Sequence, residues 1–233
     1  MHIHMFPVYS PDIGSLFRGS PVYIAGMFRW DVIAPRIASF DFSSSHTHTH
    51  THTHTLSLSI TKYYTMTDKS SFTFLPLGAI IQEFRIAGQN IVLSFDTQEH
   101  YAKYNTPHFG ATIGRVANRI KDGVIHNLNG RDYTFAKNNG PNSIHGGQTG
   151  WGQRVFDGPH TVNRNGKDAL LFKYLSPDGE EGYPGTIELR VWYTASKEDL
   201  DSASPKTVLT VEYEVEFVGT ECEETVVNLT NHR

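Results

Sequence analysis

The sequence predicts an all-β protein, a large sandwich of antiparallel sheets. Two long segments, residues 186–194 and 207–217, alternate apolar and polar side chains. A period of two gives a strand one buried face and one polar face, which is typical of antiparallel sheets. No segment shows the sustained helical period of an amphipathic helix. We therefore expect two sheets packed face to face.

The other strands follow from β-prone runs that turn signals separate. Residues 87–89 indicate a turn between two such runs. Asn129-Gly130 indicates a tight hairpin, because type I′ turns need positive φ angles at both central residues. In chain order, the expected strands are residues 72–75, 79–86, 90–95, 124–128, 131–136, 169–175, 186–194 and 207–217.

The first 65 residues differ from the rest of the chain. Charges are few, Pro, Ser and His are frequent, and neither structural period is present. In an extended chain, the alternating His-Thr tract at residues 46–54 would place every His on one face, where imidazoles can bind a transition metal. A low-complexity tract with nothing apolar to bury is the alternative that we favour. We expect residues 1–65 to be a disordered extension and residues 66–233 to be the folded domain.

Charge and composition exclude several classes of function. A net charge of -4 and a pI near 6.3 give no electrostatic basis for binding nucleic acid or an anionic membrane. No apolar run is long enough to cross a bilayer, and the first residues do not have the pattern of a signal peptide. The lone Cys222 excludes an internal disulfide and fits a reducing compartment. We expect a cytoplasmic protein, and the sequence carries no signal for its oligomeric state.

The polar groups of most interest lie between residues 110 and 151. Residues 114–120 (Gly-Arg-Val-Ala-Asn-Arg-Ile) and 142–147 (Asn-Ser-Ile-His-Gly-Gly) place Asn118, Arg119 and His145 among small or aliphatic neighbours. Burying an unpaired cation is costly, so Arg119 needs an acceptor or a wet cleft. The two glycines after His145 let the backbone turn and a ligand approach. A guanidinium, an amide and an imidazole together suit an uncharged, polyhydroxylated ligand.

These two segments resemble signature segments of the aldose 1-epimerase (galactose mutarotase) family. Residues 176–185 (Ser-Pro-Asp-Gly-Glu-Glu-Gly-Tyr-Pro-Gly) and 228–232 (Asn-Leu-Thr-Asn-His) resemble two more, in the family's order. The resemblance covers roughly residues 70–232. It implies a galactose mutarotase-like β-supersandwich, incomplete at the C-terminus, whose concave sheet holds a hexose, galactose or glucose above all. It also implies a reaction without a metal or cofactor.

The resemblance assigns roles to four residues. Mutarotation needs a base that removes the anomeric hydroxyl proton and an acid that protonates the ring oxygen. His232 matches the family's general acid, and His145 matches a second histidine that binds and polarises the sugar. Asn118 and Arg119 match contacts to sugar hydroxyls. The family's general base is a glutamate that the resemblance places after residue 233, so we expect catalysis by this chain to be impaired.

Other interpretations remain open. The chain could be a non-catalytic carbohydrate-binding sandwich that keeps Arg119 and His145. Arg119 could instead form a structural ion pair with Asp122 or Asp132. A hexose 6-phosphate substrate would need a basic cluster, and none surrounds the signature segments. The further binding candidates are the loop carboxylates Asp178, Glu180 and Glu181 and the aromatic Trp151, which in an all-β chain is more often a core residue.

Overall fold

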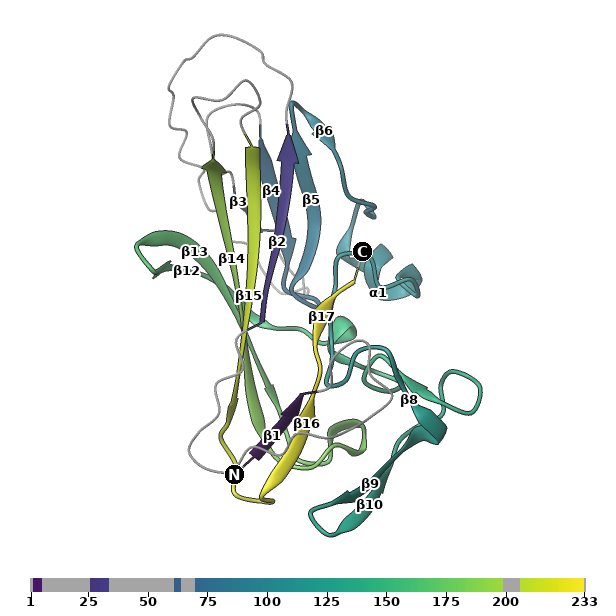
Figure 1. Ribbon diagram of the computed structural model, residues 1–233. Helices are drawn as coiled ribbons and strands as arrows, with labels where there is room; N and C mark the ends of the chain where they lie inside the picture. Colours follow the sequence, from purple (N-terminus) through teal and green to yellow (C-terminus); the bar gives the residue numbers. More distant parts are fainter. Residues whose placement is uncertain (1, 6–25, 34–60, 64–69, 199–205, 233) are drawn as a thin grey trace, which may run out of the picture.

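The structure of the chain is a computed structural model that describes residues 2–5, 26–33, 61–63, 70–198 and 206–232. Two antiparallel sheets dominate it, one lying behind the other in Figure 1. The larger sheet contains, in spatial order, β12 (Asp157–Arg164), β13 (Lys167–Ser176), β14 (Ile187–Glu198), β15 (Lys206–Phe217) and β2 (Gly26–Ile33). The smaller sheet contains β3 (Thr61–Tyr63), β4 (Ser71–Leu75), β5 (Ile80–Ile86) and β6 (Gln89–Asn90).

The predicted alternation is confirmed on the two longest strands. On β14, Ile187, Leu189 and Val191 are buried, whereas Glu188 and Arg190 between them are partly exposed. β15 alternates in the same way, and the two strands pair in register from one end to the other. The period of two therefore sets both the register and the face that meets the core.

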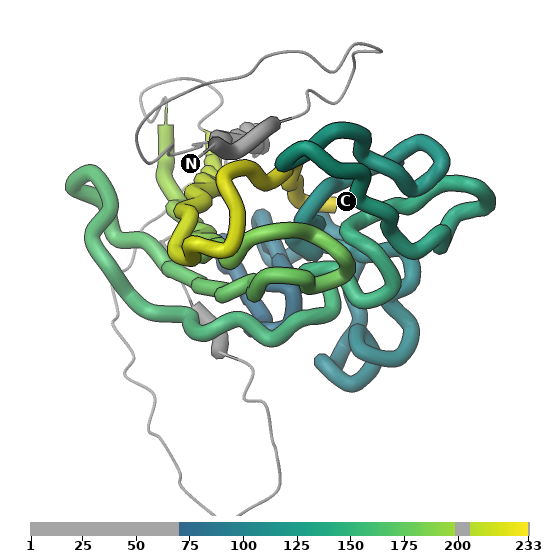
Figure 2. Tube along the Cα trace, turned by 90° about the horizontal axis from the view of Figure 1, so that it is seen from below, coloured from purple at the N-terminus to yellow at the C-terminus, as the bar shows by residue number. Residues whose placement is uncertain are grey.

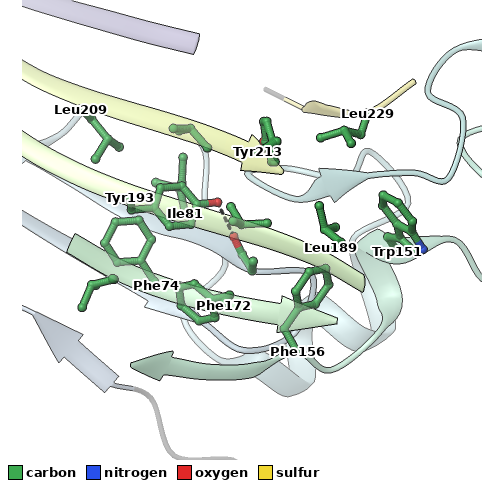
Figure 3. Packing of buried hydrophobic residues seen from close by; sticks show 14 of the residues in the cluster. Phe74, Ile81, Trp151, Phe156, Phe172, Leu189, Tyr193, Leu209, Tyr213 and Leu229 are labelled. Atoms are coloured by element: carbon green, nitrogen blue, oxygen red, sulfur yellow. Dashed lines mark hydrogen bonds between the residues drawn. The ribbon is translucent and has the colours of Figure 1, made fainter. Parts of the chain in front are cut away.

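The main core lies between the two sheets. Phe74 on β4 packs against Phe172 on β13 and Tyr193 on β14, with ring centroids 6.4 and 4.4 Å away (Figure 3). The hydroxyl of Tyr193 donates a hydrogen bond of 2.6 Å to the Ala79 carbonyl, so this buried polar group is satisfied. Full burial of each large apolar side chain contributes about 1.5–3 kcal/mol. The sandwich prediction is confirmed.

Short elements connect the sheets and build the lower part of the molecule in Figure 1. The Asn129-Gly130 hairpin is confirmed, with φ angles of 49° and 73° at the turn. The remaining strands are β1 (His2–Met5), β7 (Thr112–Ile113), β8 (Arg119–Ile120), β9 (Val124–Leu128), β10 (Arg131–Thr134), β11 (Ser143–Ile144), β16 (Glu224–Val227) and β17 (Thr230–Asn231). The 3-10 helices are η1 (Lys121–Gly123), η2 (Trp151–Gln153) and η3 (Glu180–Gly182).

Several elements of the structure differ from the predictions made from the sequence, and the short strands β7, β8, β11, β16 and β17 were not predicted. The expected strand at residues 90–95 is reduced to the end of β6. A short helix, α1 (Gln98–Tyr104), was not predicted, although Thr97 caps it by accepting a hydrogen bond of 3.2 Å from the His100 amide. Strand β12 was also not predicted. Its apolar residues are too few and too irregular to give a period of two.

Three described strands lie within the first 65 residues. The sequence predicted a disordered extension there. β1 runs parallel to β16, β2 forms one edge of the larger sheet against β15, and β3 pairs with β4. The His-Thr tract at residues 46–54 lies outside the described residues, and so do the residues on either side of it.

Candidate functional site

Three histidine side chains meet at one cleft. The ring centroids of His108 and His145 lie 5.2 Å apart, those of His145 and His232 lie 5.1 Å apart, and those of His108 and His232 lie 5.9 Å apart. The cleft has a volume of about 410 Å³. Its other lining residues are Thr106, Pro107, Asn138, Asn139, Ile144, Gly147, Gln148 and Gln153.

Backbone pairing brings His232 to this cleft. β17 pairs antiparallel with β7, and in Figure 2 the yellow C-terminal segment ends beside teal parts of the chain. The His232 amide donates to the Ala111 carbonyl, and the Gly110 amide donates to the His232 carbonyl, both over 2.8 Å. His232 Nδ1 is buried and has no hydrogen-bond partner among the described residues. Buried polar atoms without a partner are uncommon in folded proteins.

The second signature segment positions His145. β11 pairs with β8, so His145 follows directly on a strand that ends beside Asn118. The His145 amide donates to the Asn118 carbonyl over 3.1 Å, and the Asn118 amide donates to His145 Nδ1 over 3.3 Å. Both residues adopt the left-handed conformation, with φ angles of 55° and 59°, which is uncommon outside glycine. The network assigns the acceptor role to Nδ1, so the proton of the neutral ring is on Nε2, which can donate to a ligand.

The surroundings of the histidines keep two of them neutral. Burial, followed by the nearby His108, His232 and Arg119, lowers the pKa of His145 to about 4. Burial and then His232 also lower the pKa of His108. A positive charge on His232 therefore disfavours protonation of the other two rings. At neutral pH, His145 is a hydrogen-bond donor rather than a proton-donating acid.

The loop after His145 is packed tightly against the protein. A Cβ atom on Gly146 would lie 1.8 Å from the Gly114 carbonyl oxygen, and one on Gly147 would lie 2.3 Å from a carboxylate oxygen of Glu181. The predicted turn is confirmed by φ angles of 85° and 112°. The close approach at Gly146 is by the protein backbone rather than by a ligand. Asn138 holds the other side of the loop, accepting from the Ile144 amide and donating to the Gly147 carbonyl, both over 2.8 Å.

The two arginines of the first signature segment have different surroundings. Arg119 is exposed, donates from Nε to Asn139 Oδ1 over 2.8 Å and donates to Asn118 Oδ1 over 3.2 Å. These contacts with two asparagines replace the suggested ion pair with Asp122 or Asp132, and Asp132 contacts His126 instead. Asn139 itself lines the cleft, so the Arg119 guanidinium lies at its margin.

Arg115 is the buried cation, which sequence analysis did not single out. Its side chain is 1% exposed and donates to the carbonyls of Pro184 and Gly185 over 2.8 and 2.9 Å. It also donates to Ser176 Oγ over 2.7 Å. Burial lowers its pKa to about 10, which leaves it charged at neutral pH. Arg115 thus joins the first signature segment to the third one.

The loop carboxylates that were considered as ligand contacts have protein partners. Asp178 accepts from the Gly185 amide, and Glu180 accepts from Tyr174 and Ser176. Glu181 accepts from the amides of the two residues that follow Gly147. The described lining of the histidine cleft includes no Asp or Glu. The indole of Trp151 is 1% exposed and belongs to the main core, so it does not face the cleft.

His108 is the cleft histidine that sequence reasoning missed. It directly precedes Phe109-Gly110 at the start of the first signature region, but a lone histidine in a polar loop gave no signal. Within the described residues, no group of three or more His, Cys, Asp or Glu side chains has an arrangement that could hold a metal ion. None of the helices in the described part of the chain is long and apolar enough to span a membrane.

Comparison with known proteins adds independent evidence. The aldose 1-epimerase family model matches residues 62–233. The galactose mutarotase of Bos taurus is 37% identical over 178 residues, which are 74% of this chain and 46% of that protein. The human galactose mutarotase is 41% identical over 143 residues, or 61% of this chain and 36% of that protein.

Two solved structures are similar in fold. An aldose epimerase homologue from C. elegans has a TM-score of 0.55 and 30% identity, covering 71% of this chain and 47% of that one. The galactose 1-epimerase from Lactobacillus acidophilus has a TM-score of 0.56 and 26% identity, covering 71% and 45%. The chain spans about half the length of these relatives, less in the human comparison. The chain belongs to the aldose 1-epimerase family.

Proposed function

We propose that the histidine cleft binds the pyranose form of a hexose, galactose or glucose, and acts at its anomeric centre. The observation that carries this proposal is the convergence of His145 and His232, with ring centroids 5.1 Å apart, in a cleft of sugar size. The lining includes the amide side chains of Asn138, Asn139, Gln148 and Gln153, and its apolar members are Pro107 and Ile144. Such a lining suits a ligand with many hydroxyls and no charge. Family membership supports the same reaction.

The proposed reaction divides proton transfer between two groups. A base takes the proton of the anomeric hydroxyl, the bond between C1 and the ring oxygen breaks, and His232 protonates that oxygen. Rotation about the C1–C2 bond then exposes the other face of the aldehyde, and the steps reverse. His145 remains neutral and donates a hydrogen bond from Nε2 to a sugar oxygen, which stabilises charge that develops there. Asn118 and Arg119 contact hydroxyls at the margin of the cleft.

The described lining of the cleft offers no strong general base, which limits the rate of the proposed reaction. No carboxylate lines it among the described residues, and the lowered pKa of His145 makes that ring a weak base. Without a well-placed base, a concerted acid–base reaction loses about 10²- to 10⁴-fold in rate. We therefore propose that the 233-residue chain binds hexose and turns it over slowly. The same observation favours the second candidate, a carbohydrate-binding protein without catalysis.

Polarimetry tests this proposal. Freshly dissolved α-D-galactose is followed with and without the purified 233-residue chain, and binding is measured in parallel by NMR titration. We expect saturable binding that His145→Ala weakens, with a mutarotation rate close to that of buffer. His160→Ala, on exposed β12, is the matched control and should bind like the unmodified chain.

Two outcomes would contradict the proposal. Rapid mutarotation that disappears in His232→Ala would show that the chain already contains its base. The absence of any binding, or binding that is equal in His145→Ala, would show that the cleft is not a hexose site.

A further inference from the structure

The mechanism above leaves His108 without a role, although it lies as close to His145 as His232 does. Its ring is half-buried, lines the same cleft and comes from a separate segment of the chain. Neither ring nitrogen of His108 has a hydrogen-bond partner among the described residues. A neutral imidazole offers one donor and one acceptor, which is what a single hydroxyl group needs.

The loop that carries His108 is held from both ends. Asn105 ends α1, accepts from the Phe109 amide over 2.7 Å and donates to the Phe109 carbonyl over 3.3 Å. The Phe109 ring packs on Phe95 with centroids 6.0 Å apart. The Gly110 amide, directly after this anchor, donates to the His232 carbonyl. The loop is therefore fixed relative to the segment that carries His232.

The backbone of His108 adopts an uncommon conformation, and its ring packs against a neighbouring element. Its φ angle is 58°, a left-handed value that raises the energy of a residue with a side chain. Its Nδ1 lies 3.4 Å from where a Cβ atom on Gly152 would be, so the ring rests closely against η2. Residues held in such sparsely populated conformations are concentrated at ligand-binding sites. The His108 ring thus lines the cleft while it packs against η2.

We propose that His108 is a third sugar-contacting residue, which hydrogen-bonds one hydroxyl of the pyranose and selects among hexoses by that hydroxyl. This inference rests on the proposed function, because it assumes that a hexose occupies the cleft. It assigns no proton transfer to His108. The prediction is a preference in binding rather than a change in the chemical step.

Binding of deoxy sugars isolates this contact. Dissociation constants are measured by NMR titration for D-galactose and for the four monodeoxy galactoses that lack the hydroxyl at C2, C3, C4 or C6. The proteins are the unmodified chain, His108→Gly and His108→Asn. Gly and Asn both tolerate a positive φ, so neither variant strains the loop as most substitutions would. The control is His160→Asn, an exposed histidine on β12.

We expect the deoxy sugar that lacks the hydroxyl contacted by His108 to bind the unmodified chain about three- to tenfold more weakly than galactose, as loss of a neutral hydrogen bond implies. That same sugar should bind His108→Gly as well as galactose does, with His108→Asn intermediate and His160→Asn unchanged. Equal deoxy-sugar profiles in all four proteins would overturn the role of His108.

A separate comparison distinguishes failure of this inference from failure of the proposed function. If galactose binds the unmodified chain and His145→Ala weakens that binding, the cleft is a hexose site whatever His108 does. If the unmodified chain binds no galactose, or binds it equally after His145→Ala, both proposals are wrong. Thermal unfolding of each variant shows whether a loss of binding comes from unfolding of the chain.

Discussion

The larger sheet and the histidine cleft of this chain are built in different ways. β14 and β15 pair continuously, and within these two strands no residue has a positive φ. The cleft is lined mainly by loop residues and by one residue of β11, a strand of only two residues. His108 and His145 in this lining are left-handed, and so is Asn118, which pairs with His145. Repeated side-chain burial is sufficient to specify the sheet. The cleft depends instead on individual hydrogen bonds between particular side chains and backbone groups.

This difference implies that stability and ligand binding are separable in parts of the molecule. The core residues of the sheets act through burial, which is non-directional and tolerates small shifts. The cleft residues act through the positions of their donor and acceptor atoms, and several of these residues are partly exposed. Arg115 and Arg119 show the separation within one signature segment, since one is buried in the scaffold and the other is exposed at the cleft.

Arg115→Leu should have the largest effect. The substitution removes the donor to the Gly185 carbonyl and one of the two donors to the Pro184 carbonyl, which also accepts from Thr225 Oγ1. We expect a loss of about 3–5 kcal/mol in the free energy of unfolding, measured by urea denaturation. Arg119→Leu is the matched control. It should change stability by no more than about 0.5 kcal/mol and weaken galactose binding. Equal urea midpoints for the two variants would remove the distinction between scaffold and cleft.

Gly146→Ala should have a smaller effect that reaches the cleft. The added Cβ atom meets the Gly114 carbonyl, which adds about 1–3 kcal/mol of overpacking to about 1–2 kcal/mol for a side chain at positive φ. Gly130→Ala has the same problem with φ, but no atom lies within 4 Å of its Cβ position. Gly146→Ala should therefore unfold at a lower temperature and bind galactose more weakly than Gly130→Ala. Identical behaviour of the two alanine variants would show that the packing under His145 is loose.

The sequence predicted the sheets better than the cleft for reasons that particular residues illustrate. Ile187, Leu189 and Val191 repeat with the period of a strand, so their burial can be predicted locally. Helix α1 has only seven residues, too few to display a helical period, and only its Thr97 cap marks it. The burial of Arg115 depends on carbonyls 61 to 70 residues away. No local pattern indicates such contacts.

The cleft residues also differ in whether the sequence could predict them. His145 and His232 were predicted through resemblance to family segments, and the structure brings them together with Asn118 nearby. Their roles toward a sugar remain predictions. His108 was not predicted, because its position depends on the Asn105 contacts and on the pairing of β7 with β17. A functional role can be proposed for a histidine in a loop only when its spatial neighbours are known.

Hexose binding by the cleft depends most on His145 being a neutral hydrogen-bond donor. The most direct test is an NMR pH titration of the imidazole Cε1 protons, recorded with and without D-galactose. Burial and neighbouring cations disfavour the charged ring. The pKa of His145 in the folded chain is therefore about 4, which is below its value in the unfolded chain. The neutral form should persist above about pH 5, and protonation through pH 4 should break the hydrogen bond from Asn118 and weaken sugar binding.

The predicted result is a His145 midpoint near 4 together with saturable galactose-induced shifts of the His145 and His232 signals at neutral pH. The signals of exposed His126 and His160 should not shift with galactose. A His145 midpoint at the ordinary value of about 6.5, with no response of either cleft histidine to galactose, would contradict the account.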